Sequence, residues 1–374
     1  MLIQSVHRTG LAAAVLVLVA RWSPAQITSP VPSSAGARLP RTNLLVYHNR
    51  KGEVLPVKTK SDWLKRRAEI VRGFESIAGP LPGREKRCRL DMRVDSTTDC
   101  GSYERWLITY RSEPGSRVPA YMCIPKAALE SRKKFPAILC LHPTDMQYGH
   151  RVTVEKLRDN YRAYAHDLAE RGFVTLSPAY PVMANYQPDV KALGWQSGTL
   201  KAAWDNIRGL DLLDSMPFVK HGKYGAIGHS LGGHNSIYTA LLDERIKVVV
   251  SSCGFDSFLD YYGGDPANWQ PERGWCQTRY MLKLAEYRGR LAEIPFDFHE
   301  LLGALAPRPL FINAPLGDSN FRARSVDEVV AAASAVYRLY GAEKNLHVQH
   351  PPGGHDFPDE VRDQAYRLLE EKLR

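Results

Sequence analysis

The chain has 374 residues, of which 44% are hydrophobic and 24% charged, and its 28 glycines and 25 prolines are normal for a globular protein. This composition excludes a disordered chain, a collagen and a coiled coil, and the length suffices for one large α/β domain or two smaller domains. The excess of 50 lysines and arginines over 40 acidic residues gives a net charge of +10, which raises the question of nucleic acid as a partner.

The first 25 residues have the pattern of a secretory signal peptide. Met1–Gly10 is a short start that carries Arg8, Leu11–Ala20 is purely apolar, and Ser23-Pro24-Ala25 has the small residues of a cleavage site. The alternative is an uncleaved membrane anchor, but the apolar run is only about half of the ~20 residues that span a bilayer. We therefore expect residues 1–25 to be removed, and the mature protein to be secreted or periplasmic and free of the membrane.

Export makes disulfides possible for the six cysteines, which are sparse and widely spaced. Cys140 lies in an apolar run and is expected to be a small buried residue. Bridges between Cys88 and Cys100, or between Cys253 and Cys276, stay open. The spacing of histidines and cysteines does not fit a zinc site, so we expect no metal.

A linker rich in proline and serine, residues 26–40, follows the signal peptide. Residues 41–134 are predicted to form an N-terminal helix and an antiparallel entry to a sheet. The helix is expected at Ser61–Ile77, where Trp63, Ile70 and Phe74 recur at helical spacing. The strands are expected at Arg89–Val94, Trp106–Tyr110 and Ala120–Ile124.

From Phe135 to the C-terminus, short apolar runs alternate with amphipathic segments of helical length. This alternation is typical of an α/β fold with a mostly parallel sheet and helices on both faces. Helices are expected at Leu200–Ser215, Gly233–Asp243 and Val361–Leu373. The expected strands are Ala137–Leu141, Val174–Ser177, Tyr224–Ile227, Val248–Ser251, Leu310–Ala314 and Leu346–Gln349.

A G-x-S-x-G match, Gly228-His-Ser-Leu-Gly232, lies between an expected strand and an expected helix. This setting is that of a nucleophile elbow, a turn so tight that small residues must flank the nucleophile. Ser230 would then project alone at the carboxyl edge of the sheet. The alternative is a glycine-rich turn with a solvated serine.

Two further residues complete a triad in the chain order serine, acid, histidine. Asp318 follows the strand at Leu310–Ala314, and His355 follows the strand at Leu346–Gln349. His355 would take the proton from Ser230, and Asp318 would fix and stabilise the imidazole.

The rivals for these two roles are less well placed. His350 ends its strand instead of lying in the loop. Asp356 adjoins His355 in the sequence and is therefore badly placed to orient that ring. The alternative for both candidates is a solvated loop residue.

An oxyanion hole needs two fixed donors. The first is the backbone N–H after the nucleophile, which belongs to Leu231. The second is expected in the loop after Ala137–Leu141, where Pro143 has no N–H and Thr144 is therefore the candidate. We interpret His142 as a structural residue that holds this loop.

A long connection at residues 254–295 leaves the same edge of the sheet and is rich in aromatic residues. Loops at this edge usually build the substrate pocket, so we expect a cap that lines it. A packed subdomain whose aromatics form a core is the alternative. The pocket candidates are Tyr261, Tyr262, Trp269 and Trp275.

With these motifs the chain, from about Trp63 to its end, resembles the α/β-hydrolase superfamily. It is similar to bacterial secreted serine esterases grouped with the dienelactone-hydrolase-like and prolyl-oligopeptidase-like catalytic domains. The segments that carry the resemblance are Leu141-His-Pro-Thr-Asp145, Gly228-His-Ser-Leu-Gly-Gly-His-Asn235, Ala306-Pro-Arg-Pro-Leu310, Asn313–Asp318 and Gly354-His-Asp-Phe-Pro358.

The chain departs from each of the related families. Dienelactone hydrolases use a cysteine where this chain has Ser230, and prolyl oligopeptidases carry a large propeller for which there is no room. Glucuronoyl esterases are similar in size and in their signal peptide, but their elbow reads G-C-S-R-x-G, and His229 and Leu231 break that pattern. Activity on a sugar ester is therefore implied by analogy alone.

We expect a serine hydrolase that cleaves small-molecule or polysaccharide esters of carboxylic acids, without a cofactor. The alternatives are an exported serine peptidase of the prolyl-oligopeptidase type and a non-catalytic binding protein on the same fold. The basic residues form only short clusters, at Lys65–Arg67, Arg84–Arg89 and Arg132–Lys134, so we do not expect nucleic acid as a partner.

Overall fold

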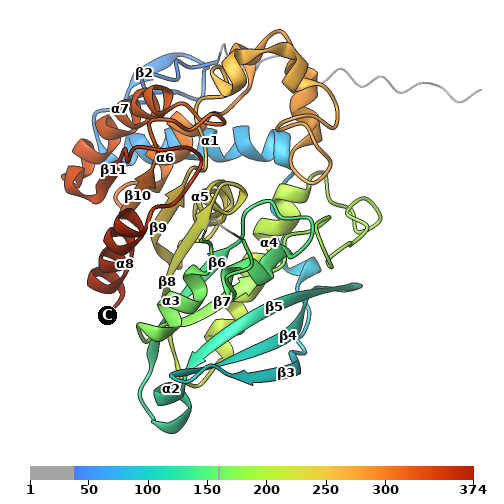
Figure 1. Ribbon diagram of the computed structural model, residues 1–374. Helices are drawn as coiled ribbons and strands as arrows, with labels where there is room; N and C mark the ends of the chain where they lie inside the picture. Colours follow the sequence, from blue (N-terminus) through green and yellow to red (C-terminus); the bar gives the residue numbers. More distant parts are fainter. Residues whose placement is uncertain (1–37, 159–160) are drawn as a thin grey trace, which may run out of the picture. The chain divides into compact units, whose positions relative to one another are not determined.

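The computed structural model describes residues 38–158 and 161–374 (Figure 1). The predicted signal peptide and most of the predicted linker lie outside the described residues. The strands are β1 Val46–His48, β2 Val54–Pro56, β3 Arg93–Asp99, β4 Tyr103–Glu113, β5 Ser116–Pro125, β6 Phe135–Leu141, β7 Val174–Pro178, β8 Val219–His229, β9 Ile246–Ser252, β10 Leu310–Asn313 and β11 Leu346–Gln349. The helices are α1 Lys60–Ala78, α2 Lys126–Glu130, α3 Tyr164–Glu170, α4 Gly198–Ser215, α5 Leu231–Leu242, α6 Phe298–Leu305, α7 Ala323–Tyr340 and α8 Asp359–Leu373.

A nine-stranded mixed sheet has the strand order β11-β10-β9-β8-β6-β7-β5-β4-β3. The strands from β6 to β11 pair in parallel, whereas β3, β4 and β5 are antiparallel and join the rest through β5 and β7. The fold is therefore the α/β-hydrolase fold that the sequence predicts, with a mostly parallel sheet and an antiparallel edge.

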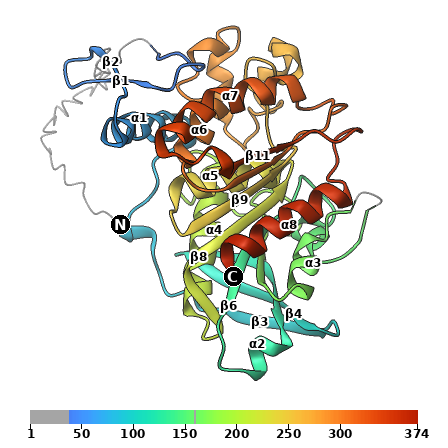
Figure 2. The ribbon, with the colours of Figure 1, turned by 90° about the vertical axis from the view of Figure 1, so that its left-hand side faces the viewer.

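Alternate residues of the central strands enter two separate cores, one on each face of the sheet. In β6, Ala137, Leu139 and Leu141 pack with α4 and α5 on one face, and Ile138 and Cys140 pack with α3 and α8 on the other. Figure 2 shows α3 and α8 on the face turned to the viewer. This burial on both faces explains the continuous apolar runs in the sequence.

The carboxyl ends of β8, β10 and β11 lead into the loops that carry the candidate triad. The amino end of β8 is different, because Lys220 and His221 are exposed and extend past the core. The apolar run in the sequence therefore predicted only the buried part of β8, at Tyr224–Ile227.

The helix α1 begins one residue earlier and ends one residue later than predicted. Thr59 is its N-cap, and Thr59 and Asp62 form a reciprocal capping box. Trp63, Ile70 and Phe74 are buried as their spacing predicts.

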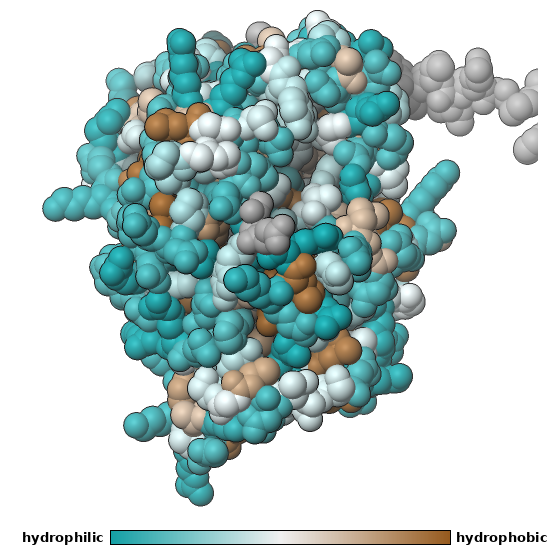
Figure 3. All heavy atoms as spheres, viewed as in Figure 1, coloured by the Kyte–Doolittle hydropathy of each residue, from teal (hydrophilic) through white to brown (hydrophobic). Residues whose placement is uncertain are grey.

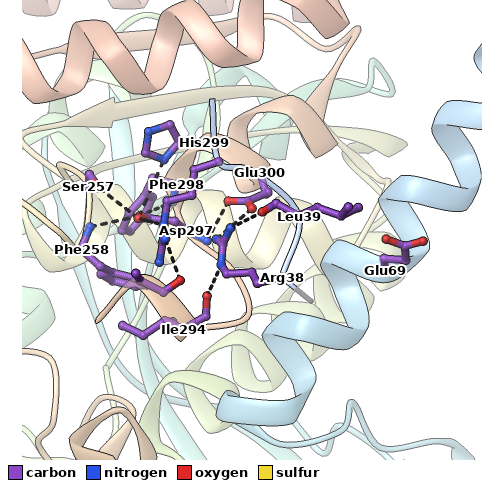
Figure 4. A network of polar contacts seen from close by, with 12 residues as sticks. Arg38, Leu39, Glu69, Ser257, Phe258, Ile294, Asp297, Phe298, His299 and Glu300 are labelled. Atoms are coloured by element: carbon purple, nitrogen blue, oxygen red, sulfur yellow. Dashed lines mark hydrogen bonds and ion pairs between the residues drawn. The ribbon is translucent and has the colours of Figure 1, made fainter. Parts of the chain in front are cut away.

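The aromatic insertion, residues 254–295, connects β9 to α6 and contains short 3₁₀ segments instead of long helices. Its end is fixed by a buried polar network (Figure 4). The carboxylate of Asp297, the N-cap of α6, accepts hydrogen bonds from Phe258 N and Phe298 N and pairs with Arg41 at 2.9 Å. Glu300 pairs with Arg38 at 2.9 Å. The start of the described chain therefore fastens the end of the insertion, and Asp297 links that end to Phe258 near its beginning.

All six cysteines lie in the described residues, and all are free thiols. The bridges Cys88–Cys100 and Cys253–Cys276 are absent from residues 38–158 and 161–374. Among these residues, no helix is both long enough and apolar enough to cross a membrane. Figure 3 shows mostly hydrophilic residues on the face that it displays, with small scattered apolar patches.

Candidate active site

Ser230 occupies a strained turn between β8 and α5. Its φ of 54° and ψ of −118° lie in a region that residues with a side chain rarely adopt. The turn is held by a hydrogen bond from Ser230 N to Ser252 O at 2.8 Å. This is the geometry of the nucleophile elbow that the G-x-S-x-G match predicts.

Gly228 and Gly232 are required because strand and helix approach each other so closely at the elbow. A Cβ on Gly228 would lie 2.2 Å from the carbonyl group of Gly232, and a Cβ on Gly232 would lie 1.9 Å from Leu141 O. Both distances are far below van der Waals contact, so neither position can carry a side chain.

Asp318 and His355 lie on adjacent loops that are joined by backbone hydrogen bonds. His355 Nδ1 lies 2.8 Å from Asp318 Oδ2. The other oxygen of Asp318 accepts N–H groups from Asn320 and Phe321. Burial alone would raise the pKa of Asp318, but these hydrogen bonds outweigh it and hold the pKa below its usual value. Asp318 is therefore an ionised carboxylate that accepts a hydrogen bond from Nδ1–H and leaves Nε2 of His355 for another partner.

The two rival residues are engaged elsewhere. His350 is bound on both sides, with Nδ1 2.7 Å from Ala314 O and Nε2 2.8 Å from Asp327. Asp356 pairs with Arg162 at 2.7 Å, and the carboxylate that bonds Nδ1 of His355 is that of Asp318.

A cavity of about 700 Å³ brings the candidate residues together. Ser230, His355, Leu231 and Thr144 all line it. Among the hydrogen bonds of the described residues, none joins Ser230 to His355, and this contact is often long until substrate binds. The full lining is Pro143, Thr144, Asp145, Met146, Val152, Arg158, Arg162, His229, Ser230, Leu231, His234, Tyr261, Gly274, Trp275, Gln277, Tyr280, Asn320, Phe321 and His355.

The loop of Thr144 is fixed by the residues on either side of it. Nδ1 of His142 lies 2.7 Å from Pro143 O, and Nε2 accepts the N–H of Tyr180 at 2.9 Å. Burial lowers the pKa of His142 to about 4, so the ring is neutral, and these partners require the proton on Nδ1. Asp145 accepts the N–H groups of Gln147 and Tyr148. His142 therefore has the loop-holding position that we expected.

The aromatic insertion covers part of the cavity, but only two of the four pocket candidates line it. Tyr261 and Trp275 lie in the lining. Trp269 is fully buried against Phe258, and it belongs to the core of the insertion. Tyr262 is 46% exposed. The cap and the packed subdomain that the sequence left as alternatives are thus both present, in different parts of the same segment.

Several lining residues were not singled out from the sequence. His234 and Tyr280 pack against Trp275, and Arg158 and Arg162 come from the connection between β6 and α3. His234 could have been found, because it lies one helical turn after Ser230 and its N–H bonds to Ser230 O. The sequence around Arg158 and Arg162 gave no comparable indication that they line the cavity.

One cluster has the donor types of a metal site. Ligand atoms of His229, Cys253 and His355 lie within 4.8 Å of one another. However, His229 Nδ1 is 2.9 Å from Ser252 Oγ, and Nδ1 of His355 is bound to Asp318. The grouping thus follows from the triad loops meeting at the elbow, and we assign no metal to it.

Comparison with known proteins gives hydrolases, most of them named as esterases. A family model described as "Glucuronyl esterase, fungi" matches residues 193–341. The chain is 25% identical over 318 residues to "Putative hydrolase YtaP" of Bacillus subtilis (strain 168), covering 82% of this chain and 100% of that protein. It is also 26% identical over 153 residues to "Carbohydrate esterase MZ0003" from an unknown prokaryotic organism, covering 39% of this chain and 34% of that protein.

The fold is similar to that of the solved glucuronoyl esterase from Solibacter usitatus. The TM-score is 0.69 at 20% sequence identity, and the likeness covers 91% of this chain and 100% of that one. The fold and these relatives define a carboxylic ester hydrolase of the α/β-hydrolase type. The family model, one of the two relatives and the solved structure are named as glucuronoyl or carbohydrate esterases, whereas the sequence motifs pointed to dienelactone-hydrolase-like and prolyl-oligopeptidase-like domains.

Proposed function

We propose that the chain is a secreted serine esterase that cleaves carbohydrate-linked carboxylic esters, with glucuronoyl esters as the substrate class. The observation that carries this proposal is that His355, hydrogen-bonded to Asp318 at 2.8 Å, lines the same cavity as the strained Ser230. The match to a glucuronyl esterase family over residues 193–341 supports the substrate class, and that segment contains Ser230 and Asp318.

The mechanism follows from the positions of these groups. Nε2 of His355 takes the proton of Ser230 Oγ as the oxygen attacks the ester carbonyl. The tetrahedral oxyanion is stabilised by the N–H groups of Leu231 and Thr144. His355 then gives the proton to the leaving alcohol, which leaves an ester between the acid and Ser230. Water repeats the sequence, releasing the acid and restoring the serine.

The cavity lining suits a sugar. Trp275 and Tyr261 offer aromatic surfaces, and the lining also contains the amides of Gln277 and Asn320 and the donor groups of Arg158. Ligand sites that combine apolar walls with a few placed polar groups bind molecules with both kinds of surface, and a pyranose ring has both. The residues His229 and Leu231 beside the serine differ from the G-C-S-R-x-G elbow of glucuronoyl esterases.

Export remains part of the proposal and rests on residues 1–25. If the chain is expressed with its full N-terminus in a secreting bacterium, we expect the mature protein outside the cytoplasm, starting near Gln26. N-terminal sequencing of the exported protein measures this. Retention of Met1 in a cytoplasmic product would contradict it.

The substrate class is tested with a panel of soluble compounds. We expect kcat/KM for an alkyl or benzyl ester of glucuronic acid to exceed that for p-nitrophenyl acetate and for a proline-containing peptide amide. Ser230→Ala serves as the background control. Amide turnover comparable to ester turnover would favour a peptidase. Binding of the glucuronate ester without turnover would favour a binding protein.

A further inference from the structure

The aromatic insertion touches the loop of the predicted oxyanion hole at one polar contact. The hydroxyl of Tyr280 lies 2.9 Å from Oγ1 of Thr144, although the two residues are 136 positions apart in the chain. Both side chains line the cavity that holds Ser230.

The chain is fixed on either side of Thr144, whereas Thr144 itself has few contacts that hold it. The bonds from His142 fix the chain before it, and the carboxylate of Asp145 fixes the turn after it. Thr144 itself is exposed, and within residues 38–158 and 161–374 the hydroxyl of Tyr280 is the hydrogen-bond partner of its side chain. Removal of the Tyr280 hydroxyl would therefore leave the side chain of Thr144 without this hydrogen bond.

Tyr280, in contrast, is firmly anchored. The first N–H groups of α4 have no partners within the helix, and Gly198 and Thr199 donate them to the carbonyl oxygens of Thr278 and Tyr280, both at 3.2 Å. The fit is tight, because a Cβ on Gly198 would lie 2.3 Å from Arg279 O. The backbone of Tyr280 is therefore tied to the amino end of the core helix α4.

The ring of Tyr280 is also packed among three other aromatic rings. Its centroid lies 6.0 Å from that of His234, 6.3 Å from that of Trp275 and 6.4 Å from that of Tyr180. Burial raises the pKa of Tyr280, so its hydroxyl stays protonated near neutral pH and can donate to Thr144.

We propose that Tyr280 is a positioning residue for the esterase reaction: its hydroxyl holds Thr144 so that the backbone N–H of Thr144 faces the oxyanion. This inference rests on the proposed function. It gives the aromatic insertion a part in the rate of the reaction as well as in the shape of the pocket. An oxyanion donor acts only as charge develops, so loosening it lowers kcat and leaves KM nearly unchanged.

The test is a double-mutant cycle on Tyr280→Phe and Thr144→Val. Loss of a whole oxyanion donor costs about 10²- to 10³-fold in kcat, and a donor that is only loosened costs part of that, about tenfold. We expect about tenfold for each single variant, no further loss in the double variant, and a KM within about twofold of the wild type. Thr144→Ser keeps the oxygen and is expected to retain most of the rate.

Two controls separate this role from general damage. Tyr337→Phe removes a buried tyrosine hydroxyl that bonds Arg308 O at 2.9 Å, away from the lining residues, and it should lower the melting temperature but not kcat. Thr144→Val changes an exposed side chain and should fold even if Tyr280→Phe does not. An unchanged kcat in either single variant, or losses that multiply in the double variant, would overturn the inference. Full activity of Ser230→Ala would instead contradict the proposed function.

Discussion

Gly317 donates its backbone N–H to the carbonyl oxygen of Gly353 at 2.8 Å, and this bond joins the loop of Asp318 to the loop of His355. Leu316 N makes a second bond of the same kind to Pro351 O at 3.0 Å. The separation between the carboxylate and the imidazole is therefore set by backbone register and not by the two side chains alone.

We predict that Gly317→Ala impairs catalysis more than folding. The new Cβ would lie 2.6 Å from Gly353 O, so the two loops must move apart. A shift near 1 Å in a catalytic group costs about 10²-fold in rate, and we expect a fall in kcat of about tenfold to 10²-fold. Gly354→Ala is the matched control, because its Cβ would be 3.8 Å from the nearest atom, Gly317 O. Equal kcat values for the two variants would argue against this role of the backbone pairing.

The two neighbouring acids should differ sharply. Asp318→Asn removes the charge that orients and stabilises the protonated ring of His355, so kcat is expected to fall about 10²- to 10⁴-fold. Asp356→Asn removes only the partner of Arg162 and should cost far less. Steady-state kinetics of both variants, with circular dichroism to establish folding, make the comparison. A larger loss for Asp356→Asn would transfer the role of the acid to that residue.

The nucleophile elbow could be predicted from the sequence because the close contacts that require its glycines involve residues near Ser230. Gly228 and Gly232 are forced by contacts within a few residues of Ser230 and with the neighbouring β6. Asp318 and His355 were found because each directly follows a short apolar strand, and parallel strands bring their carboxyl ends to one edge.

The rest of the site depends on contacts that periodicity does not encode. Tyr280 meets Thr144 only because the amino end of α4 holds the insertion in place. Trp269 and Trp275 lie six residues apart in the same insertion, yet only Trp275 lines the cavity. Which aromatic residue faces the substrate is decided by tertiary packing.

Stability should fall in acid because three buried histidines resist protonation. Burial lowers the pKa of His142 to about 4 and those of His150 and His234 to about 3. Between these values and about 6.5 the unfolded chain binds more protons than the folded chain, so stability is lost as the pH falls through this window.

His150 gives the clearest test of this acid effect, because neither of its ring nitrogens has a hydrogen-bond partner among the described residues. We expect His150→Phe to flatten the decline in melting temperature between pH 6.5 and 4. The matched control is His221→Phe at an exposed site, which should leave the pH profile as it is. A parallel shift of both variants would contradict the assignment.

Asp256 should act in the opposite direction. Its burial raises its pKa to about 8, so the folded state holds a proton that the unfolded state has lost above about pH 4. Its contribution to stability therefore decreases as the pH rises from about 4 to 8 and is constant beyond. Asp256→Asn should raise the melting temperature at pH 9 and leave it close to that of the wild type near pH 4. An equal effect at both pH values would rule out titration as the cause.

Covalent labelling with a fluorophosphonate decides whether Ser230 is the nucleophile of a Ser-His-Asp triad. Intact-protein mass spectrometry should show one adduct on the wild type, peptide mapping should place it on Ser230, and Ser230→Ala should remain unlabelled. His355→Ala should be labelled far more slowly. An unlabelled wild type, or an adduct that persists in Ser230→Ala, would show that Ser230 is not the nucleophile.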